Sequence, residues 1–388
     1  MAPGDATVTV ELGFMPESHA IPDDDHPGLY RAGPRASAPY SGESVEVHRC
    51  RATDWAQDET ARPELFRFGF DTVDLSGFDA LQDVFVRVRD AGHIADADAE
   101  TIRGALDGAV FHLASGPTLT VRHVADEGLI MRRAGPNGMS LVGPSANGMN
   151  DHGVATSVHA DQDVFGTPLT QLMDGRAPSL FRHDSPDGHN RDAGLMMVNL
   201  WVPLRQIVQP LVLADVRSVD RRRHQLRYGL PTGSFLDRED DDLAINDIWT
   251  FLHDPDQRWY LRSQMDHRSA YVFDTLGTPH GACTLPGEAV AEQCYRSLEA
   301  AESAVGSGDA AALAEVMSAA LPVHVPVGVP PALRDAITAM VAVMDEVDRD
   351  PTAVRGGRAD EWLARARDAR TRVVRLSLEL RLVVSIGA

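Results

Sequence analysis

Residues 196–203 read MMVNLWVP, a short run of apolar, β-branched and aromatic side chains that is typical of a buried strand. Comparable runs occupy residues 210–214, 259–262 and 270–274, with Pro, Gly or Asp close to their ends. Most of these runs are not separated by helical patterns, which disfavours a doubly wound parallel sheet. The pattern predicts antiparallel strands in a double-stranded β-helix, or jelly roll.

Helical patterns flank this β-rich region on both sides. Upstream, two sets of apolar residues have helical spacing and predict two helices on the outside of a sheet. They are Leu81, Val84, Phe85 and Val88, followed by Ile102, Leu106, Val110 and Leu113. Downstream, helices are expected over residues 288–305 and 310–320, around 333–344, and from Glu361.

The C-terminal segment is ambiguous. Leucines at 376, 378, 380 and 382 alternate as in a strand, but Val373, Leu376, Leu380 and Val383 also fit a helix, which we favour. The expected architecture is mainly β with flanking helices. Residues 1–130 would form an arm and helices on the core, 131–300 the jelly-roll catalytic core, and 301–388 an α-helical region that could mediate a homodimer.

The composition excludes several classes of function. The 388-residue chain carries a formal net charge of −21, so it would repel nucleic acids and anionic membrane surfaces. It contains no lysine, which removes Schiff-base catalysis and the phosphate-binding lysine of a P-loop. Its three cysteines form no disulfide framework. With no apparent secretory signal and no apolar run long enough for a membrane span, we expect a cytoplasmic protein.

A metal-ligand pattern occurs in residues 157–161, which read SVHAD. Alternate residues of a strand point to one face, so His159 and Asp161 would project together. An imidazole and a carboxylate are two of the three ligands in the facial triad of non-haem Fe(II) oxygenases. The pattern is short and also occurs by chance, so a solvated surface strand remains open as an alternative.

A candidate third ligand is His280, which follows the strand-like run at 270–274 and lies between Pro279 and Gly281. In a jelly roll, this strand would pair close to the strand of His159 despite their separation in sequence. A loop histidine without a role is the alternative.

An oxygenase that uses 2-oxoglutarate also needs a cation for the distal carboxylate, and arginine matches a carboxylate with a planar fork. Arg296 follows His280 by 16 residues, and Arg262 at the end of the 259–262 run is its rival. Either could instead be a surface arginine. The polar segment 182–192 is expected to be a solvated loop, and we favour a lid over the metal.

With these residues identified, the chain resembles the non-haem Fe(II)/2-oxoglutarate-dependent oxygenases. It is most similar to the hydroxylase/desaturase family related to a cephamycin-biosynthesis protein. The matching motifs span about residues 155–300 and are His159-x-Asp161, Asn199-x-Trp201-x-Pro203-Leu204, Arg258-Trp259-Tyr260, Pro279-His280 and Arg296-Ser297-x-Glu299.

The resemblance implies Fe(II) held by His159, Asp161 and His280, with 2-oxoglutarate as cosubstrate and dioxygen as oxidant. It implies hydroxylation or desaturation of a small molecule, in keeping with specialised biosynthesis. Two other interpretations stay open. One is a cupin-like metal-dependent dioxygenase or isomerase that does not use 2-oxoglutarate, and the other is a non-enzymatic interaction protein. Iron content and succinate release would distinguish the three.

Overall fold

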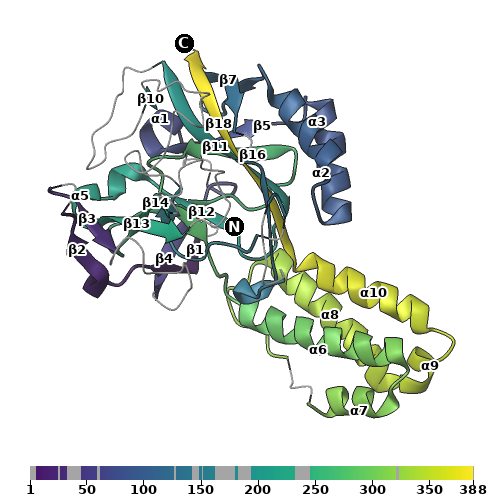
Figure 1. The fold of residues 1–388 in the computed structure, drawn as a ribbon. Coiled ribbons are helices and arrows are strands. Elements are labelled where there is room, and N and C mark those ends of the chain that lie inside the picture. Colours follow the sequence, from purple (N-terminus) through teal and green to yellow (C-terminus); the bar gives the residue numbers. More distant parts are fainter. Residues whose placement is uncertain are drawn as a thin grey trace.

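The core of the protein is a pair of β-sheets, seen here in a computed structural model (Figure 1). The structure describes residues 6–24, 27–32, 45–58, 62–125, 128–141, 148–150, 152–161, 180–181, 194–231, 245–319 and 323–387. Side chains from both sheets, among them Trp201 of one and Leu213 of the other, share an apolar cluster. The two sheets therefore face each other across a common interior.

The first sheet contains ten strands and carries both candidate histidine ligands. Its order is β1 (Thr7–Phe14), β4 (Glu46–Asp54), β15 (Trp259–Leu261), β12 (Leu211–Ala214), β17 (His280–Ala282), β9 (His159–Ala160), β14 (Ile245–Phe251), β13 (Gln225–Pro231), β3 (Tyr30–Ala32) and β2 (Ala20–Pro22). Most neighbouring strands are antiparallel, but β4 and β15, and β3 and β13, are parallel.

The second sheet contains eight strands. Its main path is β5 (Phe70–Asp74), β16 (Ser269–Asp274), β11 (Leu195–Arg205), β18 (Arg375–Gly387), β7 (Thr118–Val124) and β6 (Val110–His112), while β10 (Leu180–Phe181) pairs with β11 and β8 (Ile130–Ala134) pairs with β18. The expected strands at 196–203, 210–214, 259–262 and 270–274 are confirmed as β11, β12, β15 and β16.

Strand β11 separates two environments because successive side chains point to opposite faces. Val198, Leu200 and Val202 belong to the large apolar cluster that also contains the buried face of helix α2 (Asp79–Ala91). Asn199 and Trp201 point to the other face, into the interior between the sheets. The alternation thus places the Asn199 amide and the Trp201 indole between the two sheets, and the aliphatic side chains on the face that helix α2 covers.

The upstream helices are confirmed in part. Helix α2 covers the first predicted set of apolar residues, but α3 (Asp96–Leu106) ends before Val110, which begins strand β6. Asp107 and Gly108 explain the early end, because Asp107 has an extended backbone and Gly108 has a positive φ of 70°.

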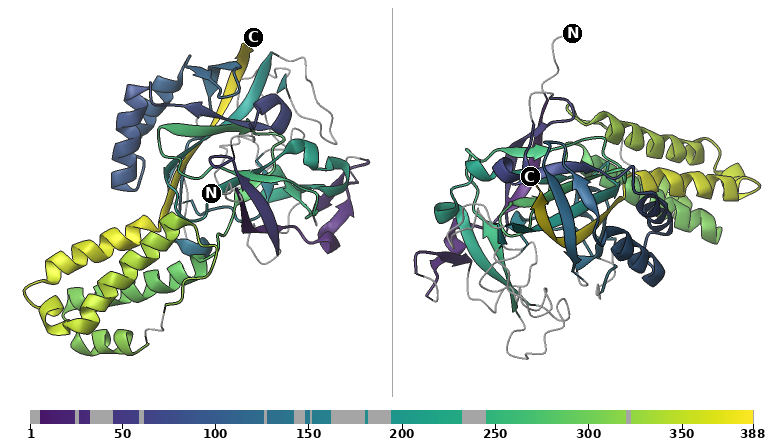
Figure 2. Two further views of the ribbon diagram at one scale, coloured as in Figure 1. Left: turned by 180° about the vertical axis from the view of Figure 1, so that it is seen from behind. Right: turned by 90° about the horizontal axis from the view of Figure 1, so that it is seen from above.

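A helical bundle projects from one end of the β core (Figures 1 and 2). It comprises α6 (Glu288–Ser307), α7 (Ala310–Ala319), α8 (Pro331–Arg349), α9 (Pro351–Arg355) and α10 (Ala359–Arg372). Trp362 of α10 is fully buried and donates to the Val343 carbonyl of α8 at 3.0 Å, and Arg370 pairs with Glu302 of α6 at 2.7 Å. Within the described residues, none of the helices is long and apolar enough to cross a membrane.

The C-terminal segment is a strand, so the helix favoured for it is wrong. Residues Arg375–Gly387 form β18, which lies between β11 on one side and β7 and β8 on the other. Leu376, Leu378, Leu380 and Leu382 are buried together on one face. The bundle is therefore an insertion between two core strands, β17 and β18, and the chain returns to the core after residue 372. Strands β1 and β4 to β7 likewise bring residues before 130 into the two sheets.

Candidate metal centre

Two histidines from distant parts of the chain meet on adjacent strands. His159 begins β9 and His280 begins β17, and these two residues are register partners in an antiparallel pair. Their imidazole rings lie 4.4 Å apart between centroids. His280 therefore lies beside His159 as expected, but the strand expected to carry it does not: residues 269–274 form β16 of the other sheet, and His280 begins the separate strand β17.

The carboxylate of Asp161 completes the group. Asp161 Oδ1 lies 3.4 Å from His159 Nε2, and Asp161 Oδ2 lies 3.8 Å from His280 Nε2. One potential ligand atom from each of the three residues lies within 4.8 Å of the others, and all three side chains are buried. This arrangement of two imidazoles and one carboxylate could hold a single metal ion.

The backbone selects which nitrogen of each imidazole faces the centre. His159 Nδ1 lies 2.9 Å from the carbonyl of Ser157, and His280 Nδ1 lies 2.9 Å from the carbonyl of Thr278. A carbonyl can only accept, so Nδ1 donates in both rings and Nε2 is the nitrogen that faces Asp161. Such an orienting bond to the second nitrogen is characteristic of metal-ligating histidines.

The charge state also suits metal binding. Burial, together with the adjacent His159, lowers the pKa of His280 to about 4. Burial opposes ionisation of Asp161, but His280, His159 and Arg381 outweigh it and hold the pKa of that carboxyl well below its usual range. At neutral pH His280 is therefore neutral and Asp161 is ionised, which is the protonation state that metal ligation requires.

Asn199 supports the carboxylate from the opposite sheet. Its Nδ2 donates to Asp161 Oδ2, and its Oδ1 accepts a 2.7 Å hydrogen bond from the hydroxyl of Thr275. Asn199 and Thr275 are both buried. Because Thr275 donates to the carbonyl end of the amide, it directs the NH₂ end toward Asp161.

Arg381 places a positive charge beside the centre. It lies on β18 as the register partner of Asn199, and its Nη2 is 3.8 Å from Asp161 Oδ1. Its side chain is only 11% exposed. Glu379, two residues earlier on the same face of β18, pairs with Arg132 at 2.7 Å. Arg381 is therefore a buried cation that flanks the three potential ligands.

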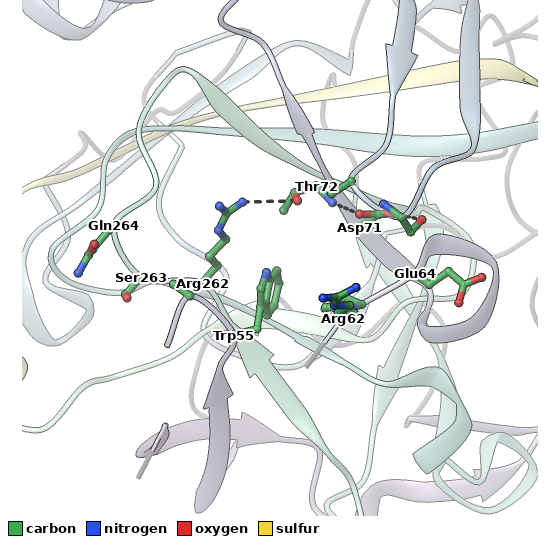
Figure 3. A pocket seen from close by; sticks show the side chains of 12 residues that line it. Trp55, Arg62, Glu64, Asp71, Thr72, Arg262, Ser263 and Gln264 are labelled. Carbon is green, nitrogen blue, oxygen red and sulfur yellow. Dashed lines mark hydrogen bonds between the residues drawn. The ribbon is translucent and has the colours of Figure 1, made fainter. Parts of the chain in front are cut away.

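The structure does not bring the two expected arginines to this centre. Arg296 lies on α6, its side chain is 61% exposed, and it pairs with Glu292 one turn away at 2.7 Å. Arg262 follows β15 and lines a separate cavity, where its Nη1 is 3.5 Å from Thr72 Oγ1 (Figure 3). This geometry gives no support to the cosubstrate role expected for either residue. The expected lid at 182–192 lies outside the described residues.

Sequence reasoning missed the roles of Asn199, Thr275 and Arg381. Asn199 stood in a quoted motif without an assigned function. Arg381 was hidden by the helix expected for its segment, although alternation of the leucines from 376 to 382 would have placed it on the opposite face. Thr275 follows β16 and has no sequence signal of its own.

No family profile matches this sequence, and no curated protein matches it. Among solved structures, it is similar to the iron and alpha-ketoglutarate-dependent endoperoxidase NvfI, with 13% identity, 99% of each chain covered and a TM-score of 0.46. The same enzyme in a different conformation gives 13% identity, 99% coverage of each chain and a TM-score of 0.47.

Proposed function

We propose that this protein is an Fe(II)- and 2-oxoglutarate-dependent oxygenase that hydroxylates or desaturates a small molecule. The observation that carries the proposal is the buried His159–Asp161–His280 group, in which both Nε2 atoms face a single carboxylate. Two histidines and one carboxylate on one side of a metal are the ligand set of non-haem Fe(II) oxygenases.

The residues present fit this metal. All three donors are nitrogen or oxygen atoms of intermediate to hard character, and no cysteine belongs to the group, which disfavours thiolate-rich sites. The hydrogen bonds from His159 and His280 to backbone carbonyls and from Asn199 to Asp161 supply the outer support that metal ligands usually have.

Arg381 supports 2-oxoglutarate as the cosubstrate. A buried guanidinium beside the metal ligands is suited to pairing with a carboxylate that enters the core. Glu379, on the same face of β18, pairs with Arg132 at 2.7 Å. We therefore assign the anchoring of the distal carboxylate to Arg381.

When bound, Fe(II) with 2-oxoglutarate and dioxygen would supply oxidative decarboxylation and an oxidant strong enough to attack a C–H bond. The side chains of this protein would hold the metal and the cosubstrate and shield them from water. His159, Asp161 and His280 would bind the metal, Asn199 would orient Asp161, and Arg381 would orient the cosubstrate. Phe273 is buried and its ring lies 4.6 Å from that of His280, so it would keep water from one side of the centre.

The test is anaerobic reconstitution of the full chain with Fe(II), followed by addition of 2-oxoglutarate and oxygen. We expect one iron per chain and succinate release that depends on both additions. The matched variant His280→Ala should lose both. Iron binding without succinate formation would favour a metal-dependent dioxygenase or isomerase of another type, and absence of iron would overturn the proposal.

A further inference from the structure

A second cavity lies apart from the metal centre and has a lining of different chemistry. It measures about 730 Å³, within the range typical of small-molecule sites. Its walls include Trp55, Arg62, Thr72, Ser115 and Arg262, which come from loops after β4 and β15, from β5 and from the turn after β6 (Figure 3). We call it the Trp55 pocket.

An aromatic layer separates the Trp55 pocket from the strand that carries Asn199. Trp55 lies 5.5 Å from Tyr271 between ring centroids, and Tyr271 stacks on Trp201 at 5.3 Å. In the sheet register, Thr72 of the pocket pairs with Tyr271, which pairs with Trp201. Two strand spacings, about 10 Å, therefore lie between Thr72 and β11. The pocket is not the space around the three potential metal ligands.

Two positively charged side chains, Arg62 and Arg262, line the pocket. Several arginines elsewhere form ion pairs with carboxylates, for example Arg87 with Asp98 at 2.9 Å and Arg217 with Asp215 at 2.8 Å. In the described part of the chain, by contrast, no carboxylate lies within ion-pair distance of Arg62 or Arg262. Two guanidinium groups thus line one cavity without forming an ion pair in the described part of the chain, and they are available to an anionic ligand.

The two acidic residues of the lining, Glu64 and Asp71, form no ion pair with these arginines. Figure 3 shows the carboxylate of Glu64 turned away from Trp55. Asp71 accepts hydrogen bonds from the Thr72 amide at 2.6 Å and from the hydroxyl and amide of Ser115, so both its oxygens are occupied within the wall. Burial also raises the pKa of Asp71.

The half-buried indole of Trp55 and the two arginines together define the chemistry of the ligand. An indole face packs well against a planar apolar group, and a guanidinium fork matches a carboxylate. The hydroxyls of Thr72, Ser115 and Ser263 can complete the hydrogen bonds of a polar substituent. We propose that the Trp55 pocket is a second small-molecule site that binds an aromatic carboxylate between Trp55 and the guanidinium groups of Arg62 and Arg262. This proposal does not depend on the oxygenase reaction.

Isothermal titration calorimetry with naphthoate tests the proposal, using the full chain stripped of metal with EDTA. We expect naphthoate to bind, and Arg262→Gln and Arg62→Gln each to weaken its affinity by about tenfold or more, because each removes one charge-assisted contact. Arg62 is exposed, so its substitution does not threaten folding. Arg296→Gln is the matched control, since it removes an exposed arginine on α6 and should leave the affinity unchanged.

Three further binding measurements test where the ligand binds and to which chemical class it belongs. Arg381→Gln should not change naphthoate affinity if the ligand lies in the Trp55 pocket and not beside the metal ligands. Neutral naphthamide and inorganic phosphate should both bind at least tenfold more weakly than naphthoate. The proposal is overturned if naphthoate does not bind, if both pocket variants bind it as the unmodified chain does, or if naphthamide or phosphate binds equally well.

Discussion

The amide of Asn199 joins the hydroxyl of Thr275 to the carboxylate of Asp161 in one buried chain of hydrogen bonds. Thr275 donates to the carbonyl oxygen of the amide, so the NH₂ end is the one that faces Asp161. These hydrogen bonds connect Asp161, which follows β9 of the ten-stranded sheet, to Asn199 and Thr275. Asn199 lies on β11 and Thr275 follows β16, and both strands belong to the eight-stranded sheet. It also explains why an asparagine occupies an otherwise apolar strand, β11.

Removing the hydroxyl of Thr275 should therefore weaken metal binding without removing a ligand. Changes to outer hydrogen-bond partners typically cost about 10- to 100-fold in metal affinity. We expect Thr275→Val to reduce Co(II) affinity within that range, as measured by visible absorption during a titration. Thr284→Val is the matched control, because the hydroxyl of Thr284 accepts from Gln209 and does not touch Asp161. Equal affinity in the two variants would show that Asp161 needs no such orientation.

Loss of either histidine should abolish stoichiometric metal binding. His159→Ala and His280→Ala each leave only two ligands on an ion that needs the complete set. His267→Ala provides the control, since His267 is also buried but is not part of the group. Metal analysis after gel filtration measures the result, with circular dichroism to establish that the variants are folded. A His280→Ala protein with one iron per chain would remove His280 from the site.

Replacement of Arg381 should weaken the binding of 2-oxoglutarate more than the binding of the metal. A buried charged pair that loses one partner typically costs about 2–5 kcal/mol, so Arg381→Gln should raise the apparent Kd for 2-oxoglutarate roughly 30-fold or more. The measurement is the binding of 2-oxoglutarate to the Fe(II)-loaded protein under anaerobic conditions. Arg296→Gln should behave as the unmodified chain does. The opposite ranking of the two variants would restore Arg296 as the anchor.

Strand β18 should be essential to the stability of the whole core. Leu380 is completely buried and pairs with Leu200 of β11, so Leu380→Ala should lower the free energy of unfolding by about 2–5 kcal/mol. The fully exposed Val327 supplies the control, and Val327→Ala should change stability by less than about 0.5 kcal/mol. Urea denaturation monitored by circular dichroism compares them. A small effect at Leu380 would mean that the C-terminal strand is a dispensable appendage.

Much of the β core was predictable because local pattern and tertiary environment agree there. Residues 196–203 are apolar on both faces, as expected for a central strand with a sheet interior on one side and a helix on the other. The sequence also predicts that His280 lies close to His159, and the two are register partners, although His280 begins a strand of its own, β17, and does not end the 270–274 strand.

The failures occur where partners distant in sequence decide the conformation. The segment from 375 to 387 satisfies both helical and strand periods, and its pairing with β11, β7 and β8 selects the strand. Because that choice was wrong, Arg381 could not be placed beside Asp161. The cosubstrate role predicted for Arg296 has no support for a related reason. The residues that follow the strand of His280 leave the core as helix α6 and do not form the next strand of the sheet.

The insertion of the helical bundle between β17 and β18 has a consequence for the order in which the protein is made. During translation, the candidate ligands His159, Asp161 and His280 emerge before the bundle helices α6 to α10, and β18 with Arg381 emerges after them. Until then, the edges of β11, β7 and β8 that β18 covers remain unpaired. A chain that has been synthesised only as far as residue 374 thus contains all three candidate metal ligands but lacks β18 and the arginine that lies beside Asp161.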